Sequence, residues 1–253
     1  MSGIAIDFTD QVVLVTGGTK GVGRGIASRF AEAGASVVVS ARSTADDLPD
    51  GWGFEAADVR DGDQAFGMVD RVVERFGRVD VVVNNAGGAP PADTSTAPAR
   101  FTERIVALNL LSAVYVAERA NQHMQRADGG SIVNVGSVAA HRPSPSAAAY
   151  GAAKAGLVNF TMTAGHEWAP KVRVNCVTAG LVRTERADLF YGDDASIARI
   201  ESTIPVGRLA TPLDVANACL FLASPLAAYV TGADLVLHGG GDRPAFLTAP
   251  DHP

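Results

Sequence analysis

Residues 11–23, QVVLVTGGTKGVG, decide the fold that this sequence predicts. The β-branched run from Gln11 to Thr16 is typical of a buried strand. A glycine-rich turn follows, and then a helical pattern that closes at Gly34. Such a unit binds a pyrophosphate through backbone amides and a helix N-terminus, although glycine-rich turns are also common without any ligand. The candidate phosphate contacts are Gly17, Thr19, Lys20, Gly21, Val22 and Gly23.

Short apolar runs alternate with amphipathic stretches along the rest of the chain. Strands are expected near 36–40, 53–58, 79–83, 130–135, 171–177 and 234–237, and helices over 64–76, 101–124, from Tyr150 to about Trp168, and over 213–222. This alternation predicts an α/β fold, a Rossmann-like, doubly wound parallel sheet of about seven strands with helices on both faces. Because the sequence has no repeat and no convincing linker, we expect a single dinucleotide-binding domain over residues 1–253.

Composition narrows the class of protein. With 47% hydrophobic and 19% charged residues, the chain is typical of a globular protein. A net charge of −6 argues against nucleic acid and anionic membrane as partners. Residues 1–10 carry acids where a signal peptide would be basic. Only Cys176 and Cys219 are present, so we expect no disulfide framework, no metal site and a reduced, cytoplasmic compartment.

Tyr150 and Lys154 lie four residues apart in a helical stretch, which places them one turn apart on one face. A free tyrosine has a pKa of about 10, and a neighbouring ammonium lowers it towards the range useful at neutral pH. The pair is therefore a candidate for general acid–base chemistry. Ser137 follows a strand-like run and could hold a substrate oxygen beside the phenol. The alternative for Tyr150 and Lys154 is a solvated helix face.

The end of the second expected strand bears on the choice of cofactor. Ala41 and Arg42 stand where an acidic residue would hold an adenosine ribose hydroxyl. Arg42 and Lys20 could together bind a ribose 2′-phosphate, which favours NADP(H). If Arg42 only caps the strand in water, NAD(H) stays open as the alternative.

Asparagines mark two further places. The strand at 79–83 runs into Asn84-Asn85-Ala86-Gly87, where small residues let a flat ligand approach the backbone and the amides can tie loops together. Asn109 lies in the apolar middle of the helix at 101–124, and a buried asparagine must find partners. Two interpretations stay open for Asn109, a hydrogen bond to core backbone and a relay that holds a water near Lys154.

Together these motifs resemble the short-chain dehydrogenase/reductase family over nearly the whole chain, from about Phe8 to Gly241. The likeness includes the glycine turn at 16–23, the Asn-Asn-Ala-Gly motif, Asp58-Val59 after the third strand, and the order and spacing of Asn109, Ser137, Tyr150 and Lys154. The sequence departs from the family at Ala179-Gly180, where Pro-Gly is usual, so the loop after the sixth strand is less preorganised.

The resemblance implies an oxidoreductase that interconverts a carbonyl and a secondary alcohol by hydride transfer with a nicotinamide cofactor. Tyr150 would protonate the carbonyl oxygen, Lys154 would hold the nicotinamide ribose, and Ser137 would orient the carbonyl. Asn109 would support a water-linked proton path. The remaining implied cofactor contacts are Asp58 and Val59 to adenine, Asn85, Ala86 and Gly87 to the adenosine and ribose region, and Val182 and Thr184 to the carboxamide.

Residues 185–206 occupy the place of the family's substrate lid. Ile197, Ile200 and Ile204 fall at helical spacing, which predicts an amphipathic helix packed on the body of the protein. Leu189, Phe190 and Tyr191 do not fit that stripe, so we expect all three to face the pocket and select an apolar ketone or 3-oxoacyl substrate. Beyond about Gly241, frequent glycine and proline predict an extended tail.

Three functions are compatible with these motifs. They are an NADP(H)-dependent carbonyl reductase, an NAD-dependent alcohol dehydrogenase of the same family, and a non-catalytic nucleotide-binding scaffold. A scaffold would be expected to have lost part of the catalytic set, and its four members are present, which favours an enzyme. The resemblance also implies a homotetramer or homodimer, built through the helices that bear Asn109 and Tyr150.

Overall fold

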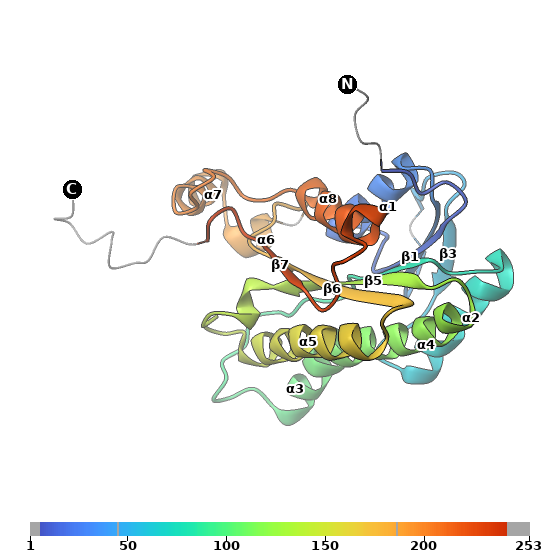
Figure 1. The fold of residues 1–253 in the computed structure, drawn as a ribbon. Coiled ribbons are helices and arrows are strands. Elements are labelled where there is room, and N and C mark those ends of the chain that lie inside the picture. The colour runs from blue at the N-terminus through green and yellow to red at the C-terminus, as the bar shows by residue number, and fades with distance from the viewer. Residues whose placement is uncertain (1–5, 45, 186, 242–253) are drawn as a thin grey trace, which may run out of the picture.

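The computed structural model describes residues 6–44, 46–185 and 187–241. Seven parallel strands form one sheet in the order β3-β2-β1-β4-β5-β6-β7 (Figure 1). The doubly wound parallel sheet predicted from sequence is confirmed. The strands are β1 (Val12–Thr16), β2 (Ser36–Ala41), β3 (Gly53–Ala56), β4 (Val81–Asn84), β5 (Gly130–Ser137), β6 (Val172–Ala179) and β7 (Asp234–Leu237).

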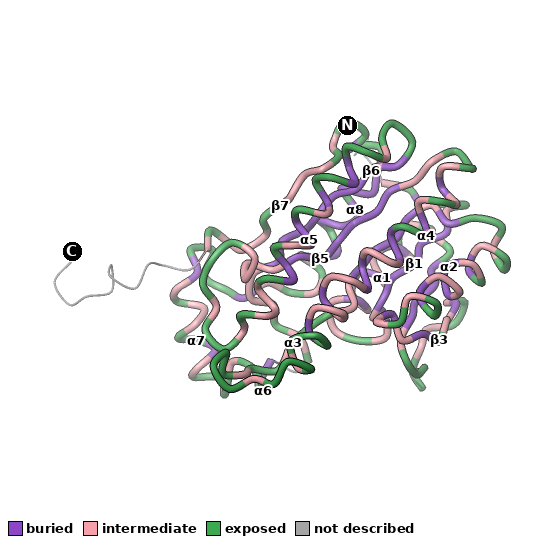
Figure 2. The backbone as a smooth tube through the Cα atoms, turned by 90° about the horizontal axis from the view of Figure 1, so that it is seen from below, coloured by how far each residue is buried: buried purple, intermediate pink, exposed green. Residues whose placement is uncertain are grey.

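Helices cover both faces of the sheet (Figure 1). On one face, α1 (Gly21–Glu32) and α8 (Pro212–Ala223) pack on an apolar cluster that includes Phe30 and Val215. On the other face lie α2 (Gly62–Phe76), α4 (Ser112–Arg126) and α5 (Ala148–Glu167). The central strands read as apolar runs because both faces are covered, and Figure 2 shows them as the buried centre of the molecule. Strand order reverses between β1 and β4, which is where ligands bind in open α/β sheets.

The helix predicted as continuous over 101–124 is interrupted. It consists of α3 (Ala99–Val106), a π-helical turn η1 (Ala107–Leu111) and α4. The apolar pattern runs through all three, so periodicity alone did not show the break. Single π-turns within helices often mark functional sites, and this one contains Asn109.

The segment expected to form a substrate lid, residues 185–206, contains two short helices, α6 (Asp188–Tyr191) and α7 (Asp194–Glu201). Ile197 and Ile204 are buried together with Leu209, and Ile200 packs against them. The helix α7 ends at Glu201, so Ile204 lies beyond the helix that the spacing of these isoleucines predicted. The 3₁₀ turns η2 (Val138–Ala140) and η3 (Pro225–Ala227) complete the elements. The tail expected beyond Gly241, like Arg186 in the lid, lies outside the described residues. Within the described ranges, no helix has the length and apolar character needed to span a bilayer.

Candidate functional site

The glycine turn between β1 and α1 is built by close backbone approach. Gly17 has φ +64°, and a Cβ added there would lie 3.1 Å from Ala86 Cα. A Cβ on Gly23 would lie 2.3 Å from the Gly17 carbonyl oxygen, so no larger residue fits there, and the positive φ of Gly17 strains any other residue at that position. The turn therefore needs its glycines for packing.

The N-terminus of α1 receives an anionic group from a distant part of the chain. The helix has no side-chain cap of its own and no acidic residue in its first turn. Instead, the Gly21 N–H donates to Glu185 Oε1 at 3.0 Å. A carboxylate at this terminus is what the partial positive charge of a helix start favours. Glu185 was not singled out from sequence, because 164 residues separate the two partners.

The amides after β4 tie this turn to the next loop. The backbone N–H groups of Asn85 and Ala86 both donate to Thr16 Oγ1 at 3.0 Å, and Asn85 Nδ2 donates to the Thr16 carbonyl at 3.0 Å. Asn84 Nδ2 donates to Asn134 Oδ1 of β5 at 2.9 Å. These bonds fix the carboxyl ends of β1, β4 and β5 relative to one another, as expected for loops that must hold one ligand.

A cleft of about 670 Å³ runs along the carboxyl ends of the strands. Its volume falls in the usual range for small-molecule sites. The predicted residues that line it are Gly17, Thr19, Lys20, Val22, Arg42, Asp58, Val59, Asn85, Ala86, Gly87, Ser137, Tyr150, Lys154, Val182 and Tyr191. The predicted residues that do not line it are Gly21, Gly23, Asn109, Thr184, Leu189 and Phe190.

One end of the cleft is cationic. Lys20 from the glycine turn and Arg42 after β2 both line it, as does Arg60, which sequence reasoning did not single out. Ser40 lines the same end, and its buried hydroxyl has no hydrogen-bond partner among the described residues. A buried hydroxyl without a partner costs free energy, so a polar ligand group there would satisfy it. This end therefore suits the adenosine part of a phosphorylated dinucleotide.

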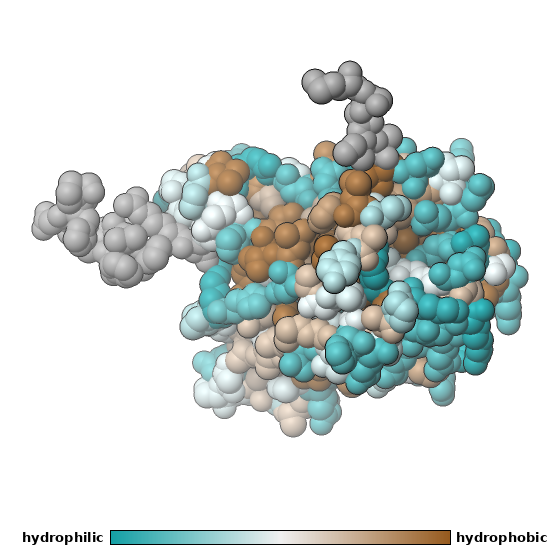
Figure 3. Space-filling view, in the orientation of Figure 1, coloured by the Kyte–Doolittle hydropathy of each residue, from teal (hydrophilic) through white to brown (hydrophobic). Residues whose placement is uncertain are grey.

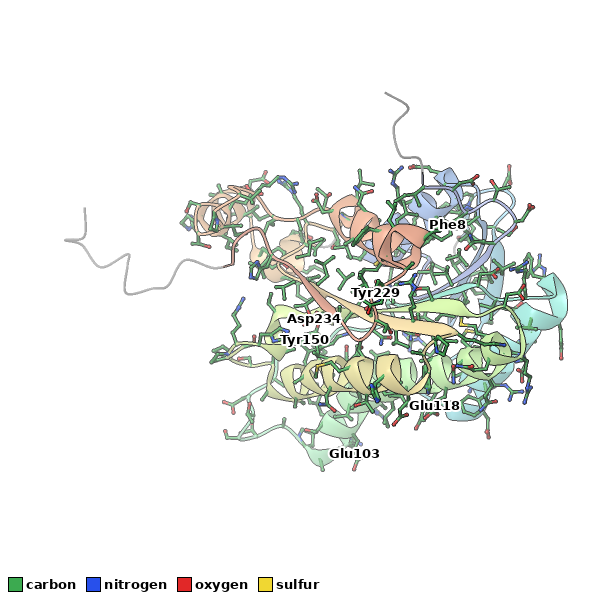
Figure 4. All side chains as sticks on the ribbon, viewed as in Figure 1. Phe8, Glu103, Glu118, Tyr150, Tyr229 and Asp234 are labelled. Carbon is green, nitrogen blue, oxygen red and sulfur yellow. The ribbon has the colours of Figure 1, made fainter. Side chains whose placement is uncertain are left out.

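Ser137, at the end of β5, and Tyr150, near the start of α5, both line the other end of the cleft, and Figure 4 labels Tyr150. Tyr150 is the third residue of α5, and its phenol is hydrogen-bonded to the Ser137 side chain. Burial raises the pKa of Tyr150, and the bond to Ser137 offsets only part of this. Lys154 does not contribute to the shift, so the pKa lowering expected from the Tyr-x-x-x-Lys spacing is not present in this structure.

Lys154 is close to Tyr150 but bonds elsewhere. Its Nζ lies 5.9 Å from the centroid of the tyrosine ring and donates to the Val135 carbonyl at 2.7 Å. Lys154 is buried, and burial lowers its pKa from 10.5 to about 8. The side chain is therefore mostly protonated at neutral pH, with a positive charge held inside the protein.

Asn109 is buried behind the loop that follows β4. Its Oδ1 accepts the Gly88 N–H at 2.7 Å, and its Nδ2 donates to the carbonyls of Gly88 and Ile105 at 3.0 and 2.9 Å. These bonds agree with the interpretation in which Asn109 is hydrogen-bonded to core backbone. A Cβ on Gly87 would lie 2.9 Å from Asn109 Oδ1 and 3.4 Å from Lys154 Nζ, so both side chains flank that glycine. The relay role stays a prediction.

The three lid residues expected to face the pocket do not share one direction. Tyr191 lines the cleft, and burial raises its pKa. Leu189 and Phe190 are 64% and 63% exposed and do not line it. The expectation that all three face the pocket was therefore wrong for Leu189 and Phe190. Consecutive residues of a helix point about 100° apart, so α6 cannot turn three neighbours towards one cleft.

Comparisons with known proteins agree with this geometry. Residues 17–241 match the model of a protein family described as enoyl-(acyl carrier protein) reductase. The 3-oxoacyl-[acyl-carrier-protein] reductase of Chlamydia muridarum is 34% identical over 92% of this chain and 98% of its own. The chain belongs to the short-chain dehydrogenase/reductase family. It is therefore an oxidoreductase that acts on CH–OH and C=O groups with NAD(P)(H).

Other short-chain dehydrogenases/reductases are similar over comparable lengths. The cis-4-hydroxycyclohexanecarboxylate dehydrogenase of Sinomonas cyclohexanicum is 36% identical over 92% of this chain and 97% of its own. Among solved structures, the ligand-free aldohexose dehydrogenase of Thermoplasma acidophilum is 30% identical, covers 97% of both chains and superposes with a TM-score of 0.88. These relatives differ in the substrates that their names give, so they support the reaction class and leave the substrate to be proposed.

Lys154→Met is expected to raise the stability of the protein at neutral pH and to abolish its activity. Because the pKa of the buried lysine is lowered to about 8, the unfolded chain binds this proton more tightly, and wild-type stability rises as pH increases from about 8 to 10.5. Below pH 8 the buried charge costs about 3 kcal/mol, offset by about 1 kcal/mol for its hydrogen bond. We expect the variant to unfold about 5 °C higher at pH 7, with little difference above pH 10.5, and to lose turnover. Thermal unfolding at both pH values checks this; a lower melting temperature at pH 7 would contradict it.

Proposed function

We propose that the protein is an NADP(H)-dependent oxidoreductase that interconverts an apolar ketone or 3-oxoacyl compound and the corresponding secondary alcohol, with Tyr150 as the acid and base. The observation that carries this proposal is the hydrogen bond between Tyr150 and Ser137, beside Lys154, in the cleft that begins at the glycine turn. Ketone-dependent oxidation of NADPH, compared with that of NADH, tests it.

NADP(H) is favoured because of the side chains at the cationic end of the cleft. Arg42 and Lys20 come from separate loops and would bind the 2′-phosphate, and charge-assisted bonds of this kind are among the strongest in proteins. Ala41 offers no carboxylate for an unphosphorylated ribose. The remaining proposed cofactor residues are Gly17, Thr19, Gly21, Val22, Gly23, Asp58, Val59, Asn85, Ala86, Gly87, Tyr150, Lys154, Val182 and Thr184. An NAD-dependent alcohol dehydrogenase is the alternative.

The catalytic residues would divide the work as follows. When bound, the nicotinamide supplies the hydride. Tyr150, with its raised pKa, holds its proton at neutral pH and donates it to the carbonyl oxygen, which Ser137 orients. Lys154 would bind the ribose; in this structure its ammonium bonds to the Val135 carbonyl and does not shift the Tyr150 pKa. Asn109 supports the path by which the phenol regains a proton.

An apolar substrate is proposed from the surroundings of Tyr150. A second cavity, of about 290 Å³, touches Tyr150 on the side of α3 and is lined mainly by small and apolar side chains, including Pro90, Phe101, Ile105 and Ala149. The Chlamydia muridarum relative is named for 3-oxoacyl groups, which also have an apolar chain. From the lid, Tyr191 is the residue that we propose to contact substrate.

We propose a homotetramer, with a homodimer as the alternative. A homotetramer with D₂ symmetry is built through at least two kinds of interface. The helices bearing Asn109 and Tyr150 would form one, and exposed Met162 lies on α5. Phe221, Leu226, Leu235 and Val236 are exposed on α8, η3 and β7, and Figure 3 shows apolar side chains gathered on this face. Light scattering at micromolar concentration is expected to give four times the mass of the chain, and a monomer would refute the proposal.

We propose that the protein works in the cytoplasm, and the proposal rests on its two cysteines. Cys176 and Cys219 are free and buried. Burial of Cys176 raises the pKa of its thiol to about 12, so this thiol is protonated and unreactive at neutral pH. Cysteines kept this way are typical of proteins from reducing compartments.

A further inference from the structure

Arg60 folds back over Asp58 in the turn between β3 and α2. Arg60 Nε donates to Asp58 Oδ1 at 2.8 Å and to Oδ2 at 3.1 Å, and Nη2 also donates to Oδ2. The backbone N–H of Arg60 donates to Oδ1 at 3.2 Å. A single arginine therefore holds both oxygens of the carboxylate.

The backbone of Asp58 is fixed from the opposite direction. Its N–H donates to Gln64 Oε1 at 3.0 Å. Gln64 belongs to the first turn of α2, where its own N–H donates to Asp61, the N-cap residue, at 3.1 Å. Side chain and backbone together leave the Asp58 carboxylate with one orientation.

Asp58 and Arg60 line the same end of the cleft as Arg42 and Ser40. The hydrogen bonds from Arg60 are the main reason that the pKa of Asp58 is lowered, and the charge of Arg42 adds to the effect. Asp58 is therefore ionised at neutral pH. An ionised carboxylate accepts hydrogen bonds and donates none.

Fold stability does not account for this pair. The side chains of Arg60 and Asp58 remain 35% and 28% exposed, and ion pairs with this exposure contribute little to folding. Neither residue belongs to the two large apolar clusters that hold the sheet together, although Val59, which lies between them in the sequence, does. A precise clamp on an accessible carboxylate in a ligand cleft points to recognition of a ligand.

We propose that Arg60 is a positioning residue for the adenine of the cofactor, because it presents Asp58 as a fixed acceptor to the 6-amino group. The inference rests on the proposed function, in which Asp58 meets the adenine. A base with a 6-oxo group would place an acceptor against the carboxylate, and two acceptors repel each other. The clamp therefore discriminates between amino and oxo bases.

The test is a fluorescence titration that gives the Kd for NADPH and for its hypoxanthine analogue, in which an oxo group replaces the 6-amino group. We expect the wild type to prefer NADPH by about tenfold, the size of one hydrogen bond to a charged group. Arg60→Ala should reduce this preference to about twofold, mainly by weakening NADPH. Asp58→Asn should reduce it similarly, and the double variant should be no worse than Asp58→Asn alone, because the two residues act as one unit.

Arg71→Ala is the matched control. Arg71 forms a similar pair with Glu55, from Nε to Oε2 at 2.8 Å, and does not line the cleft. It should keep the full preference. The inference is overturned if Arg60→Ala retains the tenfold preference, or if both analogues weaken equally while the melting temperature falls. Failure of the wild type to bind either analogue would overturn the proposed cofactor, and the inference with it.

Discussion

Replacing Tyr150 by phenylalanine is expected to lower the rate of carbonyl reduction by at least ~10²-fold, while the Kd for NADPH stays within about twofold. The ring remains, so the packing around position 150 is kept, and the phenolic proton is lost. Ser137 loses its bond to the phenol in the variant, while its Oγ still accepts the Ala139 N–H. Steady-state assays with a ketone and a separate binding titration measure the two effects.

Tyr229→Phe is the matched control for this experiment. Tyr229 is fully exposed and lies outside the cleft, so its variant should keep wild-type rates (Figure 4). Turnover of Tyr150→Phe within a few-fold of wild type would show that the proton comes from another group. A parallel loss of NADPH affinity would instead mean that Tyr150 acts mainly in cofactor binding.

Arg42→Asp is expected to reverse the cofactor preference. The change removes a charge-assisted hydrogen bond, worth about 1.5–3 kcal/mol, and places a negative charge beside the 2′-phosphate. We expect NADPH to bind at least ~10²-fold more weakly, with NADH binding unchanged or improved, because a carboxylate here can accept from ribose hydroxyls.

Arg100→Asp controls for the change in net charge. Arg100 is exposed at the start of α3 and does not line the cofactor cleft. Both variants alter the charge of the chain equally, so any long-range effect should be common to them. Unchanged NADPH affinity in Arg42→Asp would show that Arg42 is a surface residue without a role in cofactor choice.

Local patterns were enough to predict the sheet and the residues at its carboxyl ends. Parallel strands buried on both faces leave long apolar runs, and the loops after them lie at one edge of the sheet, so residues as distant as Gly17 and Tyr150 could be placed in one cleft. The break at Asn109 could not be seen, because the apolar pattern continues through the π-turn.

Contacts between distant loops needed the three-dimensional structure. Glu185 meets Gly21 only because the lid returns to the start of α1. The pKa of Tyr150 is raised because the side chain is buried, whereas its spacing to Lys154 suggested that a nearby charge would lower it. Desolvation sets the direction of the shift, and Lys154, whose ammonium bonds to the Val135 carbonyl, does not contribute to it.

The central claim is tested most directly by following nicotinamide absorbance while wild-type protein is mixed with NADPH or NADH and a panel of apolar ketones and 3-oxoacyl thioesters. We predict oxidation of NADPH that depends on the carbonyl compound, with kcat/KM at least tenfold higher than for NADH, and its loss in Tyr150→Phe. Equal or faster reaction with NADH would contradict the proposed cofactor. No oxidation of either cofactor by any apolar carbonyl in the panel would contradict the proposed function.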